Sequence, residues 1–214
     1  MRGTEDAGRP PIRALAPLVD RAERLAREGT RRLLGIAGPP GAGKSQLAAR
    51  LVAELPPGTA TVVGMDGFHI ADAELRRLGL RERKRAPETF DRAGFACLLT
   101  RLRTERGVVY VPVFDRDRED STAAGAGVAP SIRLVVVEGN YLLHWPEVRA
   151  RLDQAWYLDP PAAARRAALV ARHVRHGRSE AQARRRADGS DERNARLVAA
   201  GRDRADEFVD WGDW

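Results

Sequence analysis

The sequence predicts an α/β fold with a mostly parallel sheet that helices cover on both faces. Short apolar runs alternate along the chain with segments of helical periodicity, which is the pattern of βαβ units. The strongest strand candidate, at 132–137, is a continuous run rich in β-branched residues, as in strands that are buried on both faces. A glycine-rich loop joins the first apolar run to the helical segment after it. The 214 residues are enough for a buried core, so we expect residues 1–214 to form one domain.

The first expected element is a helix over about 12–27, because apolar residues recur on one of its faces. The apolar run at 33–37 predicts a strand, and 46–54 predicts a helix that a Pro-Pro-Gly sequence ends. A second buried strand is expected at 59–64, and a helix at 95–102 has its apolar residues spaced for a core stripe. The apolar face of the first helix contains Ile12, Leu15, Leu18, Val19, Ala22 and Leu25.

The remaining elements continue this alternation. The run at 108–113 predicts a strand, placed at an edge of the sheet because Pro112 cannot donate a ladder hydrogen bond. The strand at 132–137 is followed by another at 154–158. The helices expected after the last strand cover 160–175, 180–186 and 191–200.

The loop at 38–45 fits the pattern G-x-x-x-x-G-K-[ST], which binds nucleotide phosphates. Its glycines let successive N–H groups turn toward phosphate oxygens, and the next helix adds the positive end of its dipole. Lys44 is expected to reach the β- and γ-phosphates of ATP, and Ser45 to bind Mg²⁺. The motif predicts a P-loop NTPase fold of three layers, α/β/α, with a mostly parallel sheet. The residues expected to bind ATP here are Gly38, Pro39, Pro40, Gly41, Ala42, Gly43, Lys44, Ser45 and Gln46.

Two carboxylates follow predicted strands, at the sheet edge where open parallel sheets bind ligands. Asp66 comes just after 59–64, where a carboxylate could accept the proton of a substrate hydroxyl that attacks the γ-phosphate. The alternative is a turn aspartate before a glycine. Glu138 comes just after 132–137, where P-loop proteins hold Mg²⁺ or its water shell. We therefore assign catalysis to Asp66 and Lys44, and metal binding to Ser45, Asp66 and Glu138.

Segments between the strands supply the expected substrate contacts. His69 is expected to contact substrate rather than to act as a base. Lys84 and Arg85 could face an anionic or hydroxylated substrate, or could belong to a loop that only caps the next helix. The expected substrate contacts are Asp66, Phe68, His69, Lys84, Arg85, Phe90, Tyr110, Asp115, Arg116, Glu138, Asn140 and Tyr141. Asp115 and Arg116 could instead pair with each other.

Arginines cluster between 165 and 186. Several arginines near the P-loop would neutralise charge as the γ-phosphoryl group transfers. For most of them individually, a solvated helix face in an Arg-rich chain is the preferred interpretation. Gly177 predicts a hinge, so a mobile Arg-rich lid is expected around 165–190.

Bulk composition excludes several classes of protein. The net charge is +7, but Lys44 and Lys84 are the only lysines, so the charge indicates a general preference for arginine rather than a nucleic-acid patch. No run approaches the roughly 20 apolar residues of a membrane span, and the first eight residues hold no apolar signal core. Cys97, the only cysteine, is expected to be a core thiol. We expect a cytoplasmic protein that binds neither membranes nor nucleic acids.

Several segments in this order resemble a known family, the P-loop kinases of the uridine kinase, phosphoribulokinase and type I pantothenate kinase group. Within that group the chain is similar to bacterial fructose-transport-system kinase-like proteins. The resemblance implies a helical lid, ATP and Mg²⁺ as cofactors, a small hydroxylated substrate, and Arg172 and Arg178 as ATP-binding lid residues, with Arg172 also catalytic. Many members are dimers, which leaves a homodimer open. The segments are 38–45, 65–69, 83–91, 110–116, 137–143 and 172–178.

We therefore expect a kinase that transfers the γ-phosphate of ATP to a hydroxyl of a small metabolite. A nucleoside is slightly favoured, because Phe68, Phe90 and Tyr141 could stack on a base. Pantothenate or a ketohexose fits nearly as well. A nucleotide-dependent ATPase or switch without an acceptor is the alternative from another class, and nucleic-acid binding ranks third.

Overall fold

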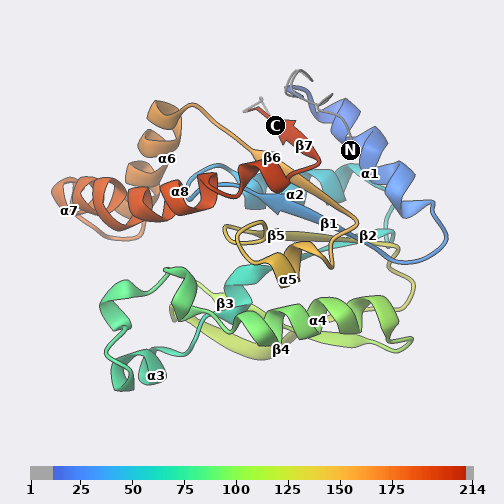
Figure 1. The fold of residues 1–214 in the computed structure, drawn as a ribbon, viewed down its shortest axis with the longest axis horizontal. Coiled ribbons are helices and arrows are strands. Elements are labelled where there is room, and N and C mark those ends of the chain that lie inside the picture. The colour runs from blue at the N-terminus through green and yellow to red at the C-terminus, as the bar shows by residue number, and fades with distance from the viewer. Residues whose placement is uncertain (1–11, 211–214) are drawn as a thin grey trace, which may run out of the picture.

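The computed structural model describes residues 12–210, and its centre is a five-stranded sheet (Figure 1). The strand order is β2-β5-β1-β6-β7, and every neighbouring pair is parallel, which confirms the predicted fold class. Because β2, β5 and β1 lie side by side and run parallel, their carboxyl ends meet at one edge, where such sheets bind ligands. The strands are β1 (Arg32–Ala37), β2 (Ala60–Gly64), β5 (Leu134–Gly139), β6 (Gln154–Leu158) and β7 (Glu207–Val209).

One face of the sheet packs against α1 (Leu15–Ala26) and α2 (Lys44–Glu54). Side chains alternate along each strand, so Leu34 and Ile36 of β1 point into this core while their neighbours point into the other one. Leu18 of α1 is fully buried against them, as the apolar face predicted from the sequence requires. The layer is therefore fixed by the two periodicities of the sequence, 3.6 for the helices and 2 for the strands.

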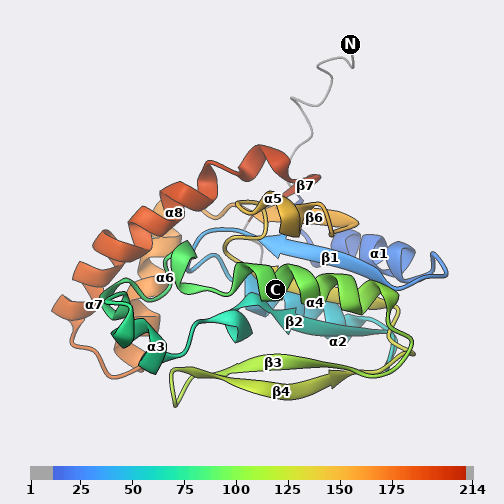
Figure 2. The same ribbon diagram turned by 60° about the horizontal axis from the view of Figure 1, so that its bottom comes forward.

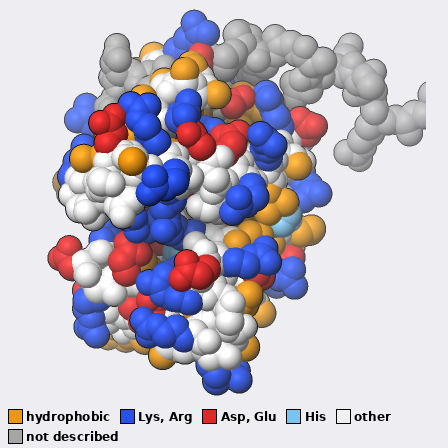
Figure 3. Space-filling view, turned by 90° about the vertical axis from the view of Figure 1, so that its left-hand side faces the viewer, with side chains coloured by type: hydrophobic (Ala, Val, Ile, Leu, Met, Phe, Trp, Pro, Cys, Tyr) orange, Lys and Arg blue, Asp and Glu red, His pale blue; other side chains and the backbone are white. Residues whose placement is uncertain are grey.

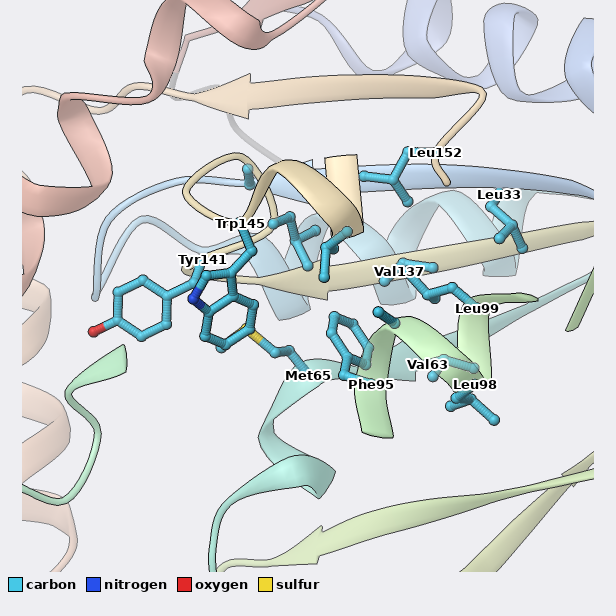
Figure 4. Close-up of a cluster of buried hydrophobic side chains, with 14 of the residues drawn as sticks. Leu33, Val63, Met65, Phe95, Leu98, Leu99, Val137, Tyr141, Trp145 and Leu152 are labelled. Carbon is cyan, nitrogen blue, oxygen red and sulfur yellow. The ribbon is translucent and has the colours of Figure 1, made fainter. Parts of the chain in front are cut away.

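The opposite face is covered by α4 (Arg92–Thr104) and the short helix α5 (Pro146–Arg149) (Figures 2 and 4). Phe95 of α4 is fully buried in this core, and its carboxyl-terminal neighbours Leu98 and Leu99 are buried with it. A fully buried side chain of this size contributes about 1.5–3 kcal/mol of hydrophobic stabilisation. This core anchors α4, and the loop that precedes α4 forms one wall of the site described below.

A two-stranded antiparallel ribbon, β3 (Val109–Asp115) and β4 (Asp120–Val128), lies outside the main sheet below this second core (Figure 2). The expected strand at 108–113 exists, but it does not join the edge of the parallel sheet. Its register with β4 shifts between Val111 and Val113, at the proline that cannot donate. The strand β4 was not predicted, because its small residues give no alternating apolar pattern.

Three helices follow β6 and lie over one end of the sheet (Figure 1). The turn between the first two contains Gly177, whose φ of +83° favours glycine. A single turn of π-helix, Ala187–Asp191, joins the last two; such turns are frequent at functional sites. The helices are α6 (Ala162–Arg175), α7 (Glu180–Arg186) and α8 (Glu192–Ala199).

One cysteine, two short elements and the lengths of the helices complete the comparison with the predicted fold. Cys97 is exposed on α4, so the expectation of a core thiol is wrong: its position lies just outside the buried stripe of that helix. A short helix, α3 (Asp72–Arg77), and β7 were not foreseen. Among residues 12–210 there is no helix with the length and apolar character needed to cross a bilayer. The N-terminal segment searched for a signal core lies outside the described residues.

Candidate active site

A cavity of about 430 Å³ opens at the carboxyl edge of the sheet, a size typical of small-molecule sites. The P-loop, the turns after β2 and β5, the tip of the β3–β4 ribbon and helices α6 and α8 all line it. Figure 3 faces this side of the molecule and shows Lys and Arg side chains gathered along a hollow between its upper and lower parts. The cavity is therefore a positively charged pocket at the position where the sequence predicted ligand binding.

The backbone of the P-loop makes turns that glycine adopts without strain and that other residues rarely adopt. Gly38, Gly41 and Gly43 have φ values of +152°, +82° and +90°, a region that other residues rarely adopt. A Cβ on Gly41 would lie 2.6 Å from Leu169 Cγ of α6, so the loop and the helix could not approach as they do. Gly38, Pro39 and Ala42 are the buried residues of this loop that do not line the cavity. Of the P-loop residues expected to bind ATP, those that line the cavity are Pro40, Gly41, Gly43, Lys44, Ser45 and Gln46.

Lys44 begins α2 and is almost fully buried, with 8% of its surface exposed. Its Nζ donates a hydrogen bond to the carbonyl oxygen of Pro39 at 3.0 Å, which closes the loop on itself. Burial lowers the pKa of Lys44 to about 8, because the charged form loses hydration. The Glu138 and Asp66 carboxylates oppose that shift, while Arg172 and Arg165 add to it. Phosphate oxygens at this position would supply the counter-charge that the lysine lacks.

Ser45 and Glu138 meet across the cavity floor, where the Ser45 hydroxyl donates to Glu138 Oε1 at 3.1 Å. Burial raises the pKa of Glu138, and the nearby Asp66 carboxylate raises it further. No group of three or more His, Cys, Asp or Glu side chains able to hold a metal occurs in the described part of the chain. One hydroxyl and one or two carboxylates fit Mg²⁺, which takes few protein ligands and completes its shell with water and phosphate oxygens.

Asp66 lies in the 3-10 turn Met65–Phe68 that follows β2, and its side chain is 36% exposed in the cavity. The strand that carries it pairs with β5, so Asp66 and Glu138 project from neighbouring strand ends. The nearest cationic partner of Asp66 is Arg116, whose Nη2 lies 3.8 Å from Oδ2, a loose contact. The carboxylate therefore remains accessible to a ligand that enters the cavity.

His69 is buried between two aromatic rings and lines the cavity. Its ring centroid lies 4.1 Å from that of Phe90 and 4.8 Å from that of Phe114. Its Nδ1 contacts the Asp66 carbonyl oxygen at 2.8 Å, so Nδ1 carries the proton, and Nε2 has no partner among the described residues. Burial lowers the pKa of His69, which keeps the ring neutral and Nε2 free to accept a hydrogen bond.

The structure brings most of the expected substrate contacts into one place but corrects several others. Lys84 is buried, where its ammonium pairs with Asp72 and the carbonyl of Glu119 and so does not line the cavity. Asp115 Oδ1 accepts from the backbone N–H groups of the next turn instead of pairing with Arg116. The expected contacts that do line the cavity are Asp66, His69, Arg85, Phe90, Arg116, Glu138 and Asn140.

The three aromatic residues offered as a base-stacking platform do not form one. Tyr141 is fully buried, and its hydroxyl donates to the Arg85 carbonyl at 2.7 Å. Phe68 packs on Phe95 of the second core, with ring centroids 5.0 Å apart. Only Phe90 of the three lines the cavity, and Tyr110 lies 61% exposed on the ribbon, away from the cavity lining.

Helix α6 contributes the two expected lid arginines, Arg172 directly and Arg178 just beyond its end, and both line the cavity. Burial lowers the pKa of Arg172, and the charge of Arg85 lowers it further. Arg165 is instead held by Glu192 of α8, at 2.5 Å. The solvated-face interpretation therefore does not hold for Arg172.

Some cavity residues were not among the predicted contacts. Phe114 and Glu119 come from the ribbon, while Asp191 and Asn194 come from the π-helix and α8. Asp191 Oδ2 accepts from His173 Nε2 at 2.7 Å, and both side chains are buried. Burial acts to raise the pKa of Asp191, but the bond from His173 lowers it on balance. Phe114 lies within the quoted segment 110–116, and Asp191 and Asn194 lie within the predicted helix 191–200, but no role in the site was predicted for them.

Several named proteins are similar to this chain in sequence or in structure. A Schizosaccharomyces pombe protein provisionally described as a uridine kinase is 32% identical over 209 residues, covering 88% of this chain and 87% of its own. The chain belongs to the uridine kinase and pantothenate kinase-like family of P-loop kinases. A family member from Silicibacter sp. TM1040, provisionally described as a fructose transport system kinase, has a crystal structure with a TM-score of 0.82. It is 40% identical, with 92% of this chain and 98% of that one covered.

Other members of the family are more distant. The pantothenate kinase of Limosilactobacillus reuteri is 31% identical over 137 residues, 59% of this chain and 44% of its own. No family model matches the sequence. Since these relatives are kinases, the protein is a phosphotransferase of the P-loop kinase class, for which ATP is the implied phosphate donor.

Proposed function

We propose that the protein transfers the γ-phosphate of ATP to a hydroxyl group of a small metabolite. The observation that carries this proposal is the meeting of Asp66 and Glu138 with Lys44 and Ser45 in one cavity at the carboxyl edge of the sheet. A phosphate-binding loop alone would suit any nucleotide-binding protein. An accessible carboxylate beside it suits an alcohol acceptor, whose proton must be removed as its oxygen attacks.

Each residue has a distinct proposed role. The P-loop N–H groups and Lys44 would hold the β- and γ-phosphates, and Arg172 would neutralise the charge that shifts during transfer. Ser45 and Glu138 would hold Mg²⁺, which when bound neutralises phosphate charge. Asp66 would orient the acceptor hydroxyl and accept its proton. Helices α6 and α7 would close over ATP, with Arg178 approaching the phosphates and Gly177 as the hinge.

The positions of the aromatic rings change the kind of acceptor that we propose. The preference for a nucleoside rested on three stacking rings, and two of them lie outside the cavity, so we retain only a small hydroxylated metabolite. The alternative, an ATPase or switch without an acceptor, fits less well because the cavity continues past the P-loop to Arg85 and Phe114. That additional space suits a second substrate.

The variant Asp66→Asn tests the proposal. Asn keeps the size of the side chain but cannot accept the proton, so kcat should fall by about 10²–10⁴. The affinity for ATP should change little, since the P-loop is untouched. Phosphate transfer to the acceptor would be followed with radiolabelled ATP, and transfer at the wild-type rate would remove Asp66 as the base. Recovery of the lost rate at higher Mg²⁺ would instead reassign Asp66 to the metal.

A further inference from the structure

Arg85 is held in a backbone conformation that arginine rarely adopts, with φ at +85°. Hydrogen bonds fix it from three sides. Its N–H donates to Thr89 Oγ1 at 3.0 Å, and its carbonyl accepts from Tyr141 Oη at 2.7 Å and from Asn194 Nδ2 at 3.2 Å. A glycine would meet the same backbone geometry without strain. The strain is thus tied to the side chain, which lines the cavity.

The Arg85 guanidinium holds a carboxylate from another part of the chain. Its Nη2 lies 3.1 Å from both carboxylate oxygens of Glu119, at the tip of the β3–β4 ribbon. Among the described residues Glu119 is the only hydrogen-bond partner of the Arg85 guanidinium, and both side chains are part-exposed in the cavity. Such an exposed pair stabilises a fold little, so it does not account for the strained arginine. The pair does show that a carboxylate fits at this guanidinium.

Positive charge is in excess around Arg85. Burial lowers the pKa of the nearby Arg172 and Arg186, and the Arg85 charge is the next largest cause for each. The pKa of His69 is also lowered by burial, with a further contribution from Arg85. Arginines that repel one another in a cavity are relieved when an anion enters.

A hydrogen-bond acceptor lies beside this charge without a partner of its own. His69 is 93% buried, and its Nε2 finds no donor among residues 12–210 although the ring lines the cavity. Because Nδ1 donates to the Asp66 carbonyl, Nε2 presents a lone pair and suits a hydroxyl group. The cavity therefore offers a site for a hydroxyl at His69 and a site for an anion at Arg85.

We propose that Arg85 binds a carboxylate or phosphate group of the acceptor in exchange for Glu119, so that the substrate is a hydroxylated anion. This inference rests on the proposed kinase function. Arg85 and Glu119 then determine specificity: the guanidinium attracts an anionic acceptor, and the Glu119 carboxylate occupies its place until the acceptor enters. Neutral acceptors of the same carbon skeleton gain nothing from displacing Glu119.

The first test compares acceptors in matched pairs with the wild-type protein and radiolabelled ATP. The pairs are glycerate with glycerol, pantothenate with pantothenyl alcohol, and fructose 6-phosphate with fructose, with uridine as a neutral nucleoside. We expect transfer to at least one acid or phosphate, with kcat/KM about 10- to 100-fold above its neutral partner, as for a lost charge-assisted hydrogen bond. The carboxylate and phosphate pairs tell the two anion sources apart.

The outcomes separate the inference from the proposed function. Equal or faster transfer to a neutral acceptor would overturn the anionic acceptor while leaving the kinase intact. Absence of transfer to every acid and phosphate would overturn it as well. Absence of transfer to any compound, neutral or anionic, would count also against the small-molecule kinase itself.

Variants of Arg85 and Glu119 should change the KM of the acceptor in opposite directions. Arg85→Gly keeps the backbone conformation without strain and should raise the KM of the anionic acceptor about 10- to 100-fold, with the KM of ATP unchanged. Glu119→Gln removes the internal competitor and should lower the acceptor KM. Arg83→Gln, an exposed arginine of the same loop that pairs with Glu88, is the control and should change neither. An Arg85→Gly protein that loses ATP affinity but keeps its acceptor discrimination would assign the guanidinium to the donor phosphates and refute the inference.

Discussion

We expect Lys44 to make ATP binding sensitive to pH in a range where few other groups titrate. Burial lowers the pKa of this lysine to about 8, so about half of the side chains are charged at pH 8 and about one in ten at pH 9. The γ-phosphate is already largely ionised over this range, because the second pKa of such a phosphate is about 6. Only the ammonium form can hold phosphate charge, and bound phosphate raises its pKa again. The affinity for ATP should therefore fall about tenfold between pH 7 and pH 9, or about 1.4 kcal/mol.

The dissociation constant of ATP with Mg²⁺ would be measured by titration calorimetry at half-unit steps between pH 7 and pH 9.5. Lys44→Arg is the matched control, because a guanidinium stays charged throughout this range. Its affinity should be weaker overall, since the longer side chain fits the closed loop poorly, but it should not depend on pH. A wild-type affinity that stays constant within twofold from pH 7 to pH 9 would refute the account of Lys44 as a dehydrated cation awaiting phosphate.

Three further predictions concern the lid and the site walls. A non-hydrolysable ATP analogue with Mg²⁺ should slow tryptic cleavage near Gly177, followed by mass spectrometry; equal cleavage with and without nucleotide would favour a solvated helix face. Gly67→Ala would place a Cβ 2.4 Å from the Pro112 carbonyl oxygen and should cost about 1–3 kcal/mol of unfolding free energy in urea, while Gly107→Ala, with no atom within 4 Å, should cost far less; equal losses would contradict the packing of the ribbon. Asp191→Asn weakens the buried bond to His173 and should cost about 1–3 kcal/mol and raise the KM of ATP; an unchanged urea midpoint would show that this pair does not hold α6 to the π-helix.

How much of the site could be predicted depended on how local its signals were. The P-loop, Asp66 and Glu138 line the cavity, where their positions at or just beyond the carboxyl ends of strands led us to expect them, because strand ends meet at one edge in a parallel sheet. Lys84 was misplaced, since the partners that bury it, Asp72 and the backbone of Glu119, lie 12 and 35 residues away. Local sequence patterns do not indicate contacts between residues so far apart in the chain.

The environment of each aromatic side chain also depends on contacts that are distant in the sequence. Phe90 and Tyr141 look alike in the sequence, yet one ring lines the cavity while the other lies wholly in the core with its hydroxyl on the Arg85 carbonyl. Which ring faces the ligand follows from the packing of α4 and α5 on the sheet. The nucleoside preference lost its support for this reason.

The sequence by itself determined the parallel α/β class, the nucleotide loop and the two strand-end carboxylates, because helical and strand periodicities and glycine-dependent turns are properties of short segments. Only the tertiary structure decided what the rest of the cavity is made of. Glu119 reaches Arg85 from 34 residues away, and Asn194 reaches it from 109 residues away, across three separate elements. Contacts over such separations exist only once the cores on both faces of the sheet have packed, so the chemistry of this end of the cavity is a product of folding.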